Sequence, residues 1–493
     1  MHGFHCDDCR SDCTGQLYGK LPTDALPDEV LLHTFYFYVD QTPDGDTWHK
    51  LDVWHTLVHV CHRWRCVVFD SPKRLNLRLL CNENRLAKNM LDVWPSSLPI
   101  VISDSALRTT RLELEGAKII NAALKHRNRI SMIDLSGVLT LLPNPFLAMT
   151  KPFPELTTLS LHSWDEHIQA LPGSFLSGSC SHLQELHFHG IPFPGLENLL
   201  LSTSGLVNLR LQEIPHSGYI TPEAVINSLS ALTKLESFEL GFRSPRSLVE
   251  RASPRPTTAT RAVLTALTSF RFQGGSAYLE EIVSLIDTPL LKSFTISFFD
   301  HLVLDTPHLR HFIRHTEMFT ALNRADVVFD SLSLYDYSDI SVTFFPPGAP
   351  WPTTDSGVLT LGVRYTNSGS RFMSLVRLFS SSLPPLPTLE RLSTRMYLSS
   401  RRDRPEATEW GEFLRLFTAM KDLDLSRNGK LTYRTFLALT DLAGEGTIEA
   451  LPALQNIFVH RLWASESHIA KVIEAFVAAR QASGHPVVVH YSE

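Results

Sequence analysis

A short apolar pattern recurs along most of this chain and constrains its fold more than any other feature. The pattern is apolar-x-x-apolar-x-apolar, as in residues 130–135, and further copies begin at 156, 183, 206, 235, 267, 291, 329, 420 and 454. Weaker copies begin near 109, 356 and 389. From 130 to 291 the copies are 26, 27, 23, 29, 32 and 24 residues apart. A self-similar unit of this length predicts stacked repeats rather than one globular core.

The spacing within each copy predicts a short strand. Side chains alternate between the two faces of a strand, so the residue between the last two apolar positions faces away from the core. Twelve of these thirteen residues are polar, which indicates a parallel sheet with one solvated face; a sheet covered on both faces would require apolar residues there. The thirteen residues are Glu113, Asp134, Ser160, His187, Arg210, Glu239, Arg271, Thr295, Ser333, Thr360, Ser393, Asp424 and Phe458.

Helical patterns lie between several of these strands. Residues 222–229 and 278–285 have the spacing of amphipathic helices, and 466–482 predicts a helix near the end of the chain, before a final strand at 485–491. The repeat length and pattern resemble those of leucine-rich repeat proteins. We therefore expect an α/β fold in which residues 103–493 form a strand–helix solenoid. The usual asparagine ladder is mostly missing and the spacing becomes irregular after 296, so the solenoid should be irregular.

Three insertions follow predicted strands, near 241–261, 343–356 and 398–409. Insertions at equivalent positions of a solenoid project from one rim and often belong to its binding face. The first carries five arginines against one glutamate, a composition that suits phosphate recognition and equally suits a disordered segment. Arg243 and Arg246 in this insertion, with Arg210 and Arg271 on the strands, are candidate target-binding residues. The alternative is that the insertions are solvated loops without a partner.

The first hundred residues have a different pattern. Residues 26–35 read as a helix with Pro27 in its first turn and acidic residues at 28 and 29, where the helix dipole favours negative charge. Residues 54–69 form a second amphipathic stretch. Two short helices cannot bury both apolar faces on each other, so the surplus surface needs either the next domain or a partner.

The Leu-Pro-x-Glu-Val-Leu run beginning at Leu26 and the Val-Cys-x-x-Trp run beginning at Val60 resemble the F-box. The resemblance covers about residues 22–102 and is especially similar to F-box-like proteins of mushroom-forming fungi. It implies a helical module over 21–102 that docks on the Skp-family adaptor of cullin-based ubiquitin ligases. Residues 1–20, before this module, are expected to be a disordered tail. The resemblance places seven residues at or just under the adaptor-binding surface: Leu26, Pro27, Val30, Leu31, Val60, Cys61 and Trp64.

One departure from the F-box pattern is the long connection between the two motifs, residues 36–53, which we interpret as a surface loop because Pro43, Asp44 and Gly45 form a turn signal. The alternative to adaptor docking is that these helices only cap the end of the solenoid.

The composition also limits the other classes of partner and the compartment that we expect for this protein. The net charge of −6 and pI near 6.4 predict no general attraction to nucleic acid or anionic membranes, and no apolar run approaches the ~20 residues of a membrane span. The polar first residues lack the features of a secretory signal. Seven scattered cysteines are typical of free thiols, so we expect a cytoplasmic or nuclear protein.

The sequence contains three partial metal-site patterns, and each lacks residues that a complete site requires. Cys6, Cys9 and Cys13 lack a second zinc-binding knuckle, and His55 and His59 lack the intervening glutamate of zinc proteases. The stretch from Asp424 has too few carboxylates for a calcium loop. No phosphate-binding loop, dinucleotide fingerprint or nucleophile elbow is present.

The sequence therefore predicts a chain without cofactor or metal that is not itself an enzyme. Its expected function is target recognition within a Skp–cullin–F-box type ubiquitin ligase, with the target protein held by the solenoid. The alternative is a leucine-rich repeat scaffold that binds proteins without any ligase role.

Overall fold

The computed structural model describes residues 26–40, 54–72, 74–81, 95, 98–104, 113–136, 146, 149–165, 168–178, 180–244, 261–299, 306–316, 322–330, 338–347, 358–365, 371–382, 389–397, 406–426, 429–444, 451–460 and 467–492. The predicted tail over 1–20 lies outside these residues. So do most residues of the three predicted insertions, namely 245–260, 348–356 and 398–405.

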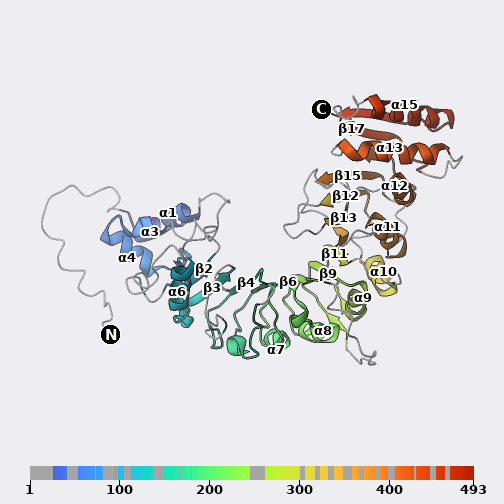
Figure 1. Cartoon of the computed structure of the whole chain (residues 1–493). Coiled ribbons are helices and arrows are strands. Elements are labelled where there is room, and N and C mark those ends of the chain that lie inside the picture. The colour runs from blue at the N-terminus through green and yellow to red at the C-terminus, as the bar shows by residue number, and fades with distance from the viewer. Residues whose placement is uncertain are drawn as a thin grey trace, which may run out of the picture.

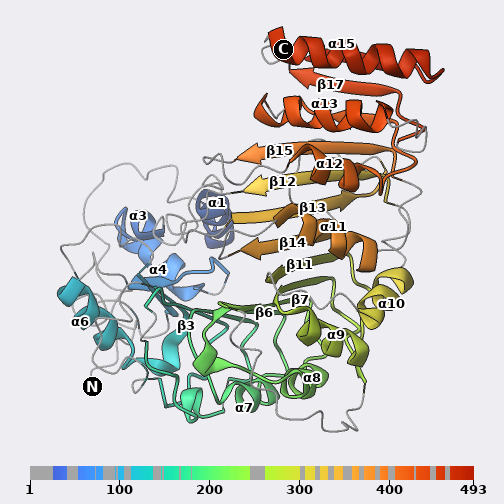
Figure 2. The ribbon, with the colours of Figure 1, turned by 45° about the vertical axis from the view of Figure 1, so that its right-hand side comes forward.

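One sheet of sixteen strands runs through most of the chain (Figures 1 and 2). In spatial order the strands are β1 (Leu79–Cys81), β2 (Ile100–Ser103), β3 (Ile130–Leu135), β4 (Thr158–His162), β5 (Glu185–His189), β6 (Asn208–Ile214), β7 (Ser237–Phe242), β9 (Ser269–Gly274), β11 (Ser293–Phe299), β14 (Leu359–Tyr365), β13 (Ser338–Phe345), β12 (Arg324–Asp330), β15 (Arg391–Tyr397), β16 (Asp422–Asp424), β17 (Asn456–His460) and β18 (Val488–Ser492). Two short strands, β8 (Ala262–Val263) and β10 (Ile286–Asp287), pair separately.

Helices cover the outer side of this sheet, and the sheet lines the inner side of the arc (Figure 1). Along the solenoid they are α6 (Glu113–Ala123), α7 (Leu196–Leu201), α8 (Pro222–Ser230), α9 (Ser276–Leu285), α10 (Pro307–His315), α11 (Arg371–Ser382), α12 (Ala407–Leu414), α13 (Gly429–Gly444) and α15 (Ser467–Ala482). Among the described residues near the amino terminus, the helices are α1 (Asp28–Asp40), α3 (Trp54–Val58) and α4 (His62–Asp70).

The strands bury the residues that the repeat pattern predicts. In β4, Leu159 and Leu161 are fully buried, whereas Ser160 and His162 are only partly covered. The same apolar position is occupied by phenylalanine in three neighbouring strands, where the rings of Phe270 and Phe238 lie 5.3 Å apart and stack. Equivalent side chains in adjacent strands meet because the strands are only about 4.8 Å apart. The predicted α/β leucine-rich repeat solenoid is confirmed.

The irregularity expected after 296 is a reversal of strand order. After β11 the chain forms β12 three places further along the sheet, returns through β13, and places β14 directly against β11. β13 is antiparallel to both of its neighbours. The predicted strand beginning at Phe329 is wrong, because alternating Ala325, Val327 and Phe329 are the residues that β12 buries. Ser333, predicted to face outward, lies outside the described residues.

Two predictions at the start of the solenoid are corrected. Residue Glu113 begins helix α6 rather than lying in a strand, since Ile120, Ala123 and Leu124 are buried at helical spacing. The sheet instead begins at β1 and β2, inside the range 21–102 that was assigned to the helical module. Both strands are entirely buried, so they lack the polar alternation that reveals the later strands.

The amino-terminal helices form a module with its own core, separate from the core of the solenoid. Leu31, Phe35, Trp54 and Val68 are among its buried residues. The indole N–H of Trp54 donates a hydrogen bond to the carbonyl oxygen of Arg78 at 3.1 Å, which ties the module to the residues that enter β1.

The second amphipathic stretch is two helices rather than one. Cys61 has an extended backbone, and its Sγ accepts a hydrogen bond from the backbone N–H of Trp64 at 3.4 Å, so it caps α4. Helix α1 also continues to Asp40, which corrects the surface-loop prediction over residues 36–40. Residues 41–53 lie outside the described residues. No helix in the described part of the chain is long and apolar enough to span a membrane.

Candidate functional site

Helix α1 presents apolar side chains on two opposite faces. Leu31, Leu32 and Phe35 enter the core of the module. Val30 and Phe37 point to the other side of the helix and are 44% and 48% exposed. Seven residues separate Val30 from Phe37, so they lie on the same side of the helix. An outward apolar stripe therefore remains after the module has filled its own core.

Helix α4 is held against the beginning of α1 by Arg63. Its guanidinium lies 2.7 Å from Asp28 Oδ1 and also donates a hydrogen bond to the carbonyl oxygen of Leu26. Val60, which is 59% exposed, and Cys61 directly precede α4. The exposed apolar residues of both motifs thus belong to the same small module. We call this set the N-terminal apolar face: Leu26, Pro27, Val30, Tyr36, Phe37, Tyr38 and Val60.

The structure places the seven predicted adaptor-binding residues at different depths. Leu26, Pro27, Val30, Val60 and Cys61 are exposed. Leu31 lies in the core beneath them with 2% of its surface exposed. Trp64 is half-buried, and its ring lies 4.7 Å from that of Phe35.

Sequence reasoning missed three residues of the N-terminal apolar face, Tyr36, Phe37 and Tyr38, because they fell in the range interpreted as a loop. The signal was present in the spacing, since Phe37 follows Val30 by seven residues and Thr34 by three.

On the solenoid, the residues predicted to face outward lie next to one another in register across the sheet. Strand by strand from β3 to β18, this central row consists of Asp134, Ser160, His187, Arg210, Glu239, Arg271, Thr295, Thr360, Thr343, Asp326, Ser393, Asp424, Phe458 and His490. Every predicted outward residue except Glu113 and Ser333 is in it. The row runs along the inner side of the arc.

A pocket of about 370 Å³ opens on this concave surface beside Arg271. Its most unusual residue is Glu213, which has the left-handed φ of 49° at a register shift in β6. This conformation costs a non-glycine residue about 1–2 kcal/mol. It directs the carboxylate toward Arg364 on β14, whose Nη1 lies 2.6 Å away, and toward Gln273 on β9, which donates at 3.0 Å.

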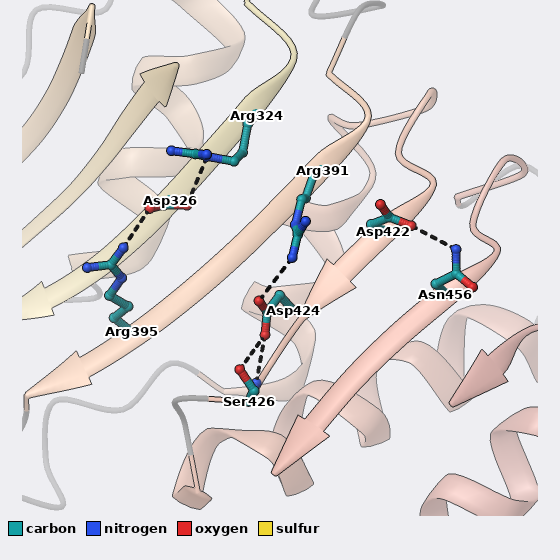
Figure 3. A network of polar contacts seen from close by, with 8 residues as sticks. All are labelled: Arg324, Asp326, Arg391, Arg395, Asp422, Asp424, Ser426 and Asn456. Carbon is teal, nitrogen blue, oxygen red and sulfur yellow. Dashed lines mark hydrogen bonds and ion pairs between the residues drawn. The ribbon is translucent and has the colours of Figure 1, made fainter. Parts of the chain in front are cut away.

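A second polar network occupies the carboxyl-terminal half of the concave surface (Figure 3). Arg395 donates to Asp326 at 3.0 Å, and both side chains are more than nine-tenths buried. Burial raises the pKa of the Asp326 carboxyl, and this outweighs the lowering by Arg395 and Arg324. Further along, Asp424 accepts hydrogen bonds from the backbone N–H and hydroxyl of Ser426.

The concave ion pairs share one property. In each pair, the guanidinium is more exposed than the carboxylate: 59% against 14% for Arg271 and Glu239, and 39% against 8% for Arg391 and Asp424. In the amino-terminal module the carboxylate is the more exposed partner: Asp28 is 60% exposed and Arg63 is 33% exposed. At Arg271 and at Arg391 the concave surface therefore presents the cationic donor while its paired carboxylate is largely covered.

The candidate target-binding arginines lie at or near this surface. Arg210 and Arg271 are members of the central row and are exposed. Arg243 follows β7 and is only partly exposed. Its guanidinium lies close to Gly190, whose φ of +68° and contact with the Ser163 carbonyl leave no room for a side chain. Arg246 lies outside the described residues.

Three histidines gather on β4 and β5. The ring of His162 lies 4.4 Å from that of His187 and 5.9 Å from that of His189. Burial, together with the two neighbouring rings, lowers the pKa of His162 to about 4. The cluster is thus neutral near pH 7 and acts through hydrogen bonds, as between His162 and Ser160 at 2.7 Å.

Within the described residues, no group of three or more histidine, cysteine, aspartate or glutamate side chains is arranged to hold a metal ion. His55 lies in α3 and His62 at the start of α4, in separate helices. The cysteines at 6, 9 and 13 lie outside the described residues.

Comparison with known proteins gives little beyond this geometry. No family model matches the chain, and no curated protein matches it. Among solved structures, an internalin from Listeria monocytogenes is 12% identical with a TM-score of 0.29, over 76% of this chain and 89% of that one. The Rad7 and Elc1 complex in yeast contains a chain 14% identical with a TM-score of 0.27, over 88% of each chain. At these TM-scores the likeness carries no argument about function.

Proposed function

We propose that this protein is the target-recognition subunit of a Skp–cullin–F-box type ubiquitin ligase. The observation that supports the proposal is the N-terminal apolar face. A helical module that already has its own core still exposes Val30, Phe37 and Val60, each by more than two fifths. Large apolar side chains left exposed on one small module are typical of a protein-docking site.

In this proposal the module binds a Skp-family adaptor and, through it, a cullin, while the solenoid holds the target protein. The contribution of this chain is proximity, because tethering raises the effective concentration of the target at the site of ubiquitin transfer. No side chain of the chain acts as nucleophile or general base. The resemblance of residues 22–102 to the F-box motivates the identity of the adaptor. Its compartment is the cytoplasm or the nucleus, where such ligases operate.

The other candidate is a leucine-rich repeat scaffold that binds a protein without any ligase connection. The polar concave surface favours protein binding in either case, because both candidates use the solenoid in the same way. They differ in the occupant of the N-terminal apolar face. The scaffold needs none, whereas the ligase subunit needs the adaptor.

The test is co-purification of the full chain with the Skp-type adaptor of its host, using surface variants that leave the core intact. Val30→Glu/Phe37→Glu should weaken adaptor binding at least about thirtyfold, since central apolar contacts of an interface are typically worth 2 kcal/mol or more each. The matched control is Leu201→Glu/Leu290→Glu, which changes two apolar residues of the solenoid that are 51% and 56% exposed. This control should bind the adaptor like the wild type.

These surface positions are preferable to Trp64, whose ring packs against Phe35. Loss of that packing would unfold the module as well as remove a contact. The proposal is overturned if the wild-type chain does not bind the adaptor. It is also overturned if the Val30→Glu/Phe37→Glu variant binds as tightly as the control.

A further inference from the structure

We infer that the concave surface binds an extended acidic segment of the target protein, with carboxylates held at Arg271 and at Arg391. The inference rests on the proposed function in taking the occupant to be a target. It goes further by naming the chemistry and spacing of the segment. Three observations carry it: the exposure of the ion pairs, the residues between the two arginines, and the distance between their strands.

The first observation concerns what the surface offers to a ligand. Glu239 is 14% exposed and accepts a hydrogen bond from Gln212 at 2.7 Å besides its ion pair with Arg271. Asp424 is 8% exposed and accepts two bonds from Ser426. These carboxylates have little accessible surface, whereas Arg271 and Arg391 are 59% and 39% exposed.

A ligand meeting this surface therefore encounters guanidinium N–H donors, and its matching groups are acceptors with negative charge. Carboxylates fit a guanidinium in a planar, two-bond geometry, and these charge-assisted bonds are about twice as strong as bonds between neutral groups. A basic segment would face the same exposed guanidiniums and be repelled.

The second observation is the floor between the two arginines, which is uncharged on three of its four strands; on the fourth, β12, Asp326 is buried and paired with Arg395. From Arg271 the central row continues through Thr295, Thr360 and Thr343. The neighbouring row contributes Ser297, Gly362 and Ser341, which are also small and uncharged. On these three strands the strip accommodates a peptide backbone without competing charges, and the buried Asp326 beyond them is paired with Arg395.

The third observation is the span. Five steps between adjacent strands separate β9, which carries Arg271, from β15, which carries Arg391. At about 4.8 Å per step the distance along the sheet is about 24 Å. An extended peptide advances about 3.3 Å per residue, so about seven residues reach from one arginine to the other. The segment should carry acidic residues at its two ends and small or neutral residues between them.

The test uses a fluorescent nonapeptide with two glutamates at each end and a Ser-Gly-Thr-Gly-Ser centre. Its binding to the full chain is measured by fluorescence anisotropy at low salt. Replacing the four glutamates by glutamine should weaken binding about tenfold or more, because it removes the charge-assisted bonds at both ends. A peptide with the same four glutamates but a one-residue centre should also bind more weakly, since it reaches only one arginine.

Protein variants separate the site from general electrostatic attraction. Arg271→Gln and Arg391→Gln should each weaken binding of the acidic nonapeptide by about fivefold or more. The matched control is Arg314→Gln, which removes the same charge from an exposed position on α10, on the outer side of the arc. This control should retain wild-type affinity for the peptide.

The inference is overturned if the glutamine peptide binds as well as the glutamate peptide, or if Arg314→Gln weakens binding as much as Arg271→Gln. Equal binding of the long and short acidic peptides would overturn the predicted spacing. None of these outcomes depends on the adaptor, and adaptor co-purification does not depend on Arg271. The failure of this inference is therefore distinguishable from the failure of the proposed ligase role.

Discussion

The left-handed backbone at Glu213 leads to a stability prediction whose sign is unusual. Glu213→Ala and Glu213→Gly both remove the carboxylate that contacts Arg364 and Gln273. These partners are largely buried, so each variant should lose about 1.5–3 kcal/mol from the lost charged hydrogen bonds. Glycine also relieves the cost of a φ of 49°, which is about 1–2 kcal/mol.

Part of this relief is offset by the larger backbone entropy of glycine in the unfolded chain, about 0.5–1 kcal/mol. The glycine variant should therefore be more stable than the alanine variant by about 0.5–1 kcal/mol. Urea unfolding followed by far-ultraviolet circular dichroism measures both variants. At equal slopes, a higher midpoint for the glycine variant is the expected result.

The matched control is the same pair of substitutions at Glu474, which is exposed in the interior of α15. There the glycine variant should be the less stable one by about 1 kcal/mol, as in any ordinary helix. The reasoning is refuted if glycine is also the less stable residue at 213. That result would mean that the backbone there is not left-handed and that Glu213 is not held against a conformational cost.

Two further predictions concern the same end of the concave surface. The pKa of His162 is lowered to about 4, so this residue is held neutral in the folded protein. The free energy of unfolding should therefore be highest above about pH 6.5 and should fall by about 3 kcal/mol as the pH drops to 4, because the unfolded chain binds the proton more readily. In His162→Gln the midpoint of urea unfolding should change much less between pH 6.5 and 4 than in the wild type. An equally steep dependence of the midpoint on pH would contradict the assignment. Gly190→Ala should destabilise the protein by about 1–3 kcal/mol more than Gly484→Ala, since only the former meets a carbonyl; equal melting temperatures would refute this.

The repeat pattern predicted the solenoid because the burial of each strand residue depends on residues close to it in the sequence. Alternation within six residues decides which side chain faces the core, so every residue of the central row from Asp134 to Phe458 was predicted except Thr343 and Asp326. Thr343 lies on β13, where no copy of the pattern was predicted, and Asp326 lies on β12, where the pattern was misread. Strands β1 and β2 were missed because they are buried on both faces and show no alternation. The reversed order of β12 to β14 depends on which strands pair across the sheet, and single-strand patterns contain no information on that.

For the candidate sites, the sequence predicted which residues take part better than it predicted how far each of them is buried. The helix that carries Val30 and Leu31 was predicted, but which of the two is exposed depends on how α3 and α4 pack against it. Arg271 was selected as an outward residue, whereas Glu213 was not, because a left-handed residue at a register shift has no signature in the apolar spacing. The ion pairs of the concave surface join residues from strands far apart in the chain, which composition cannot reveal.

The reversed strands also affect how the protein can assemble during folding. In an ordinary solenoid each repeat docks on the previous one, and order spreads from neighbour to neighbour. Here Phe294 pairs with Leu359, so β12, β13 and β14 must fold together before the next strand can add to the sheet. The contacts on either side of these three strands are short-range, whereas their own contacts close a long loop and should form late. We expect the two arms of the arc to gain order independently, with the reversed strands as the step that joins them.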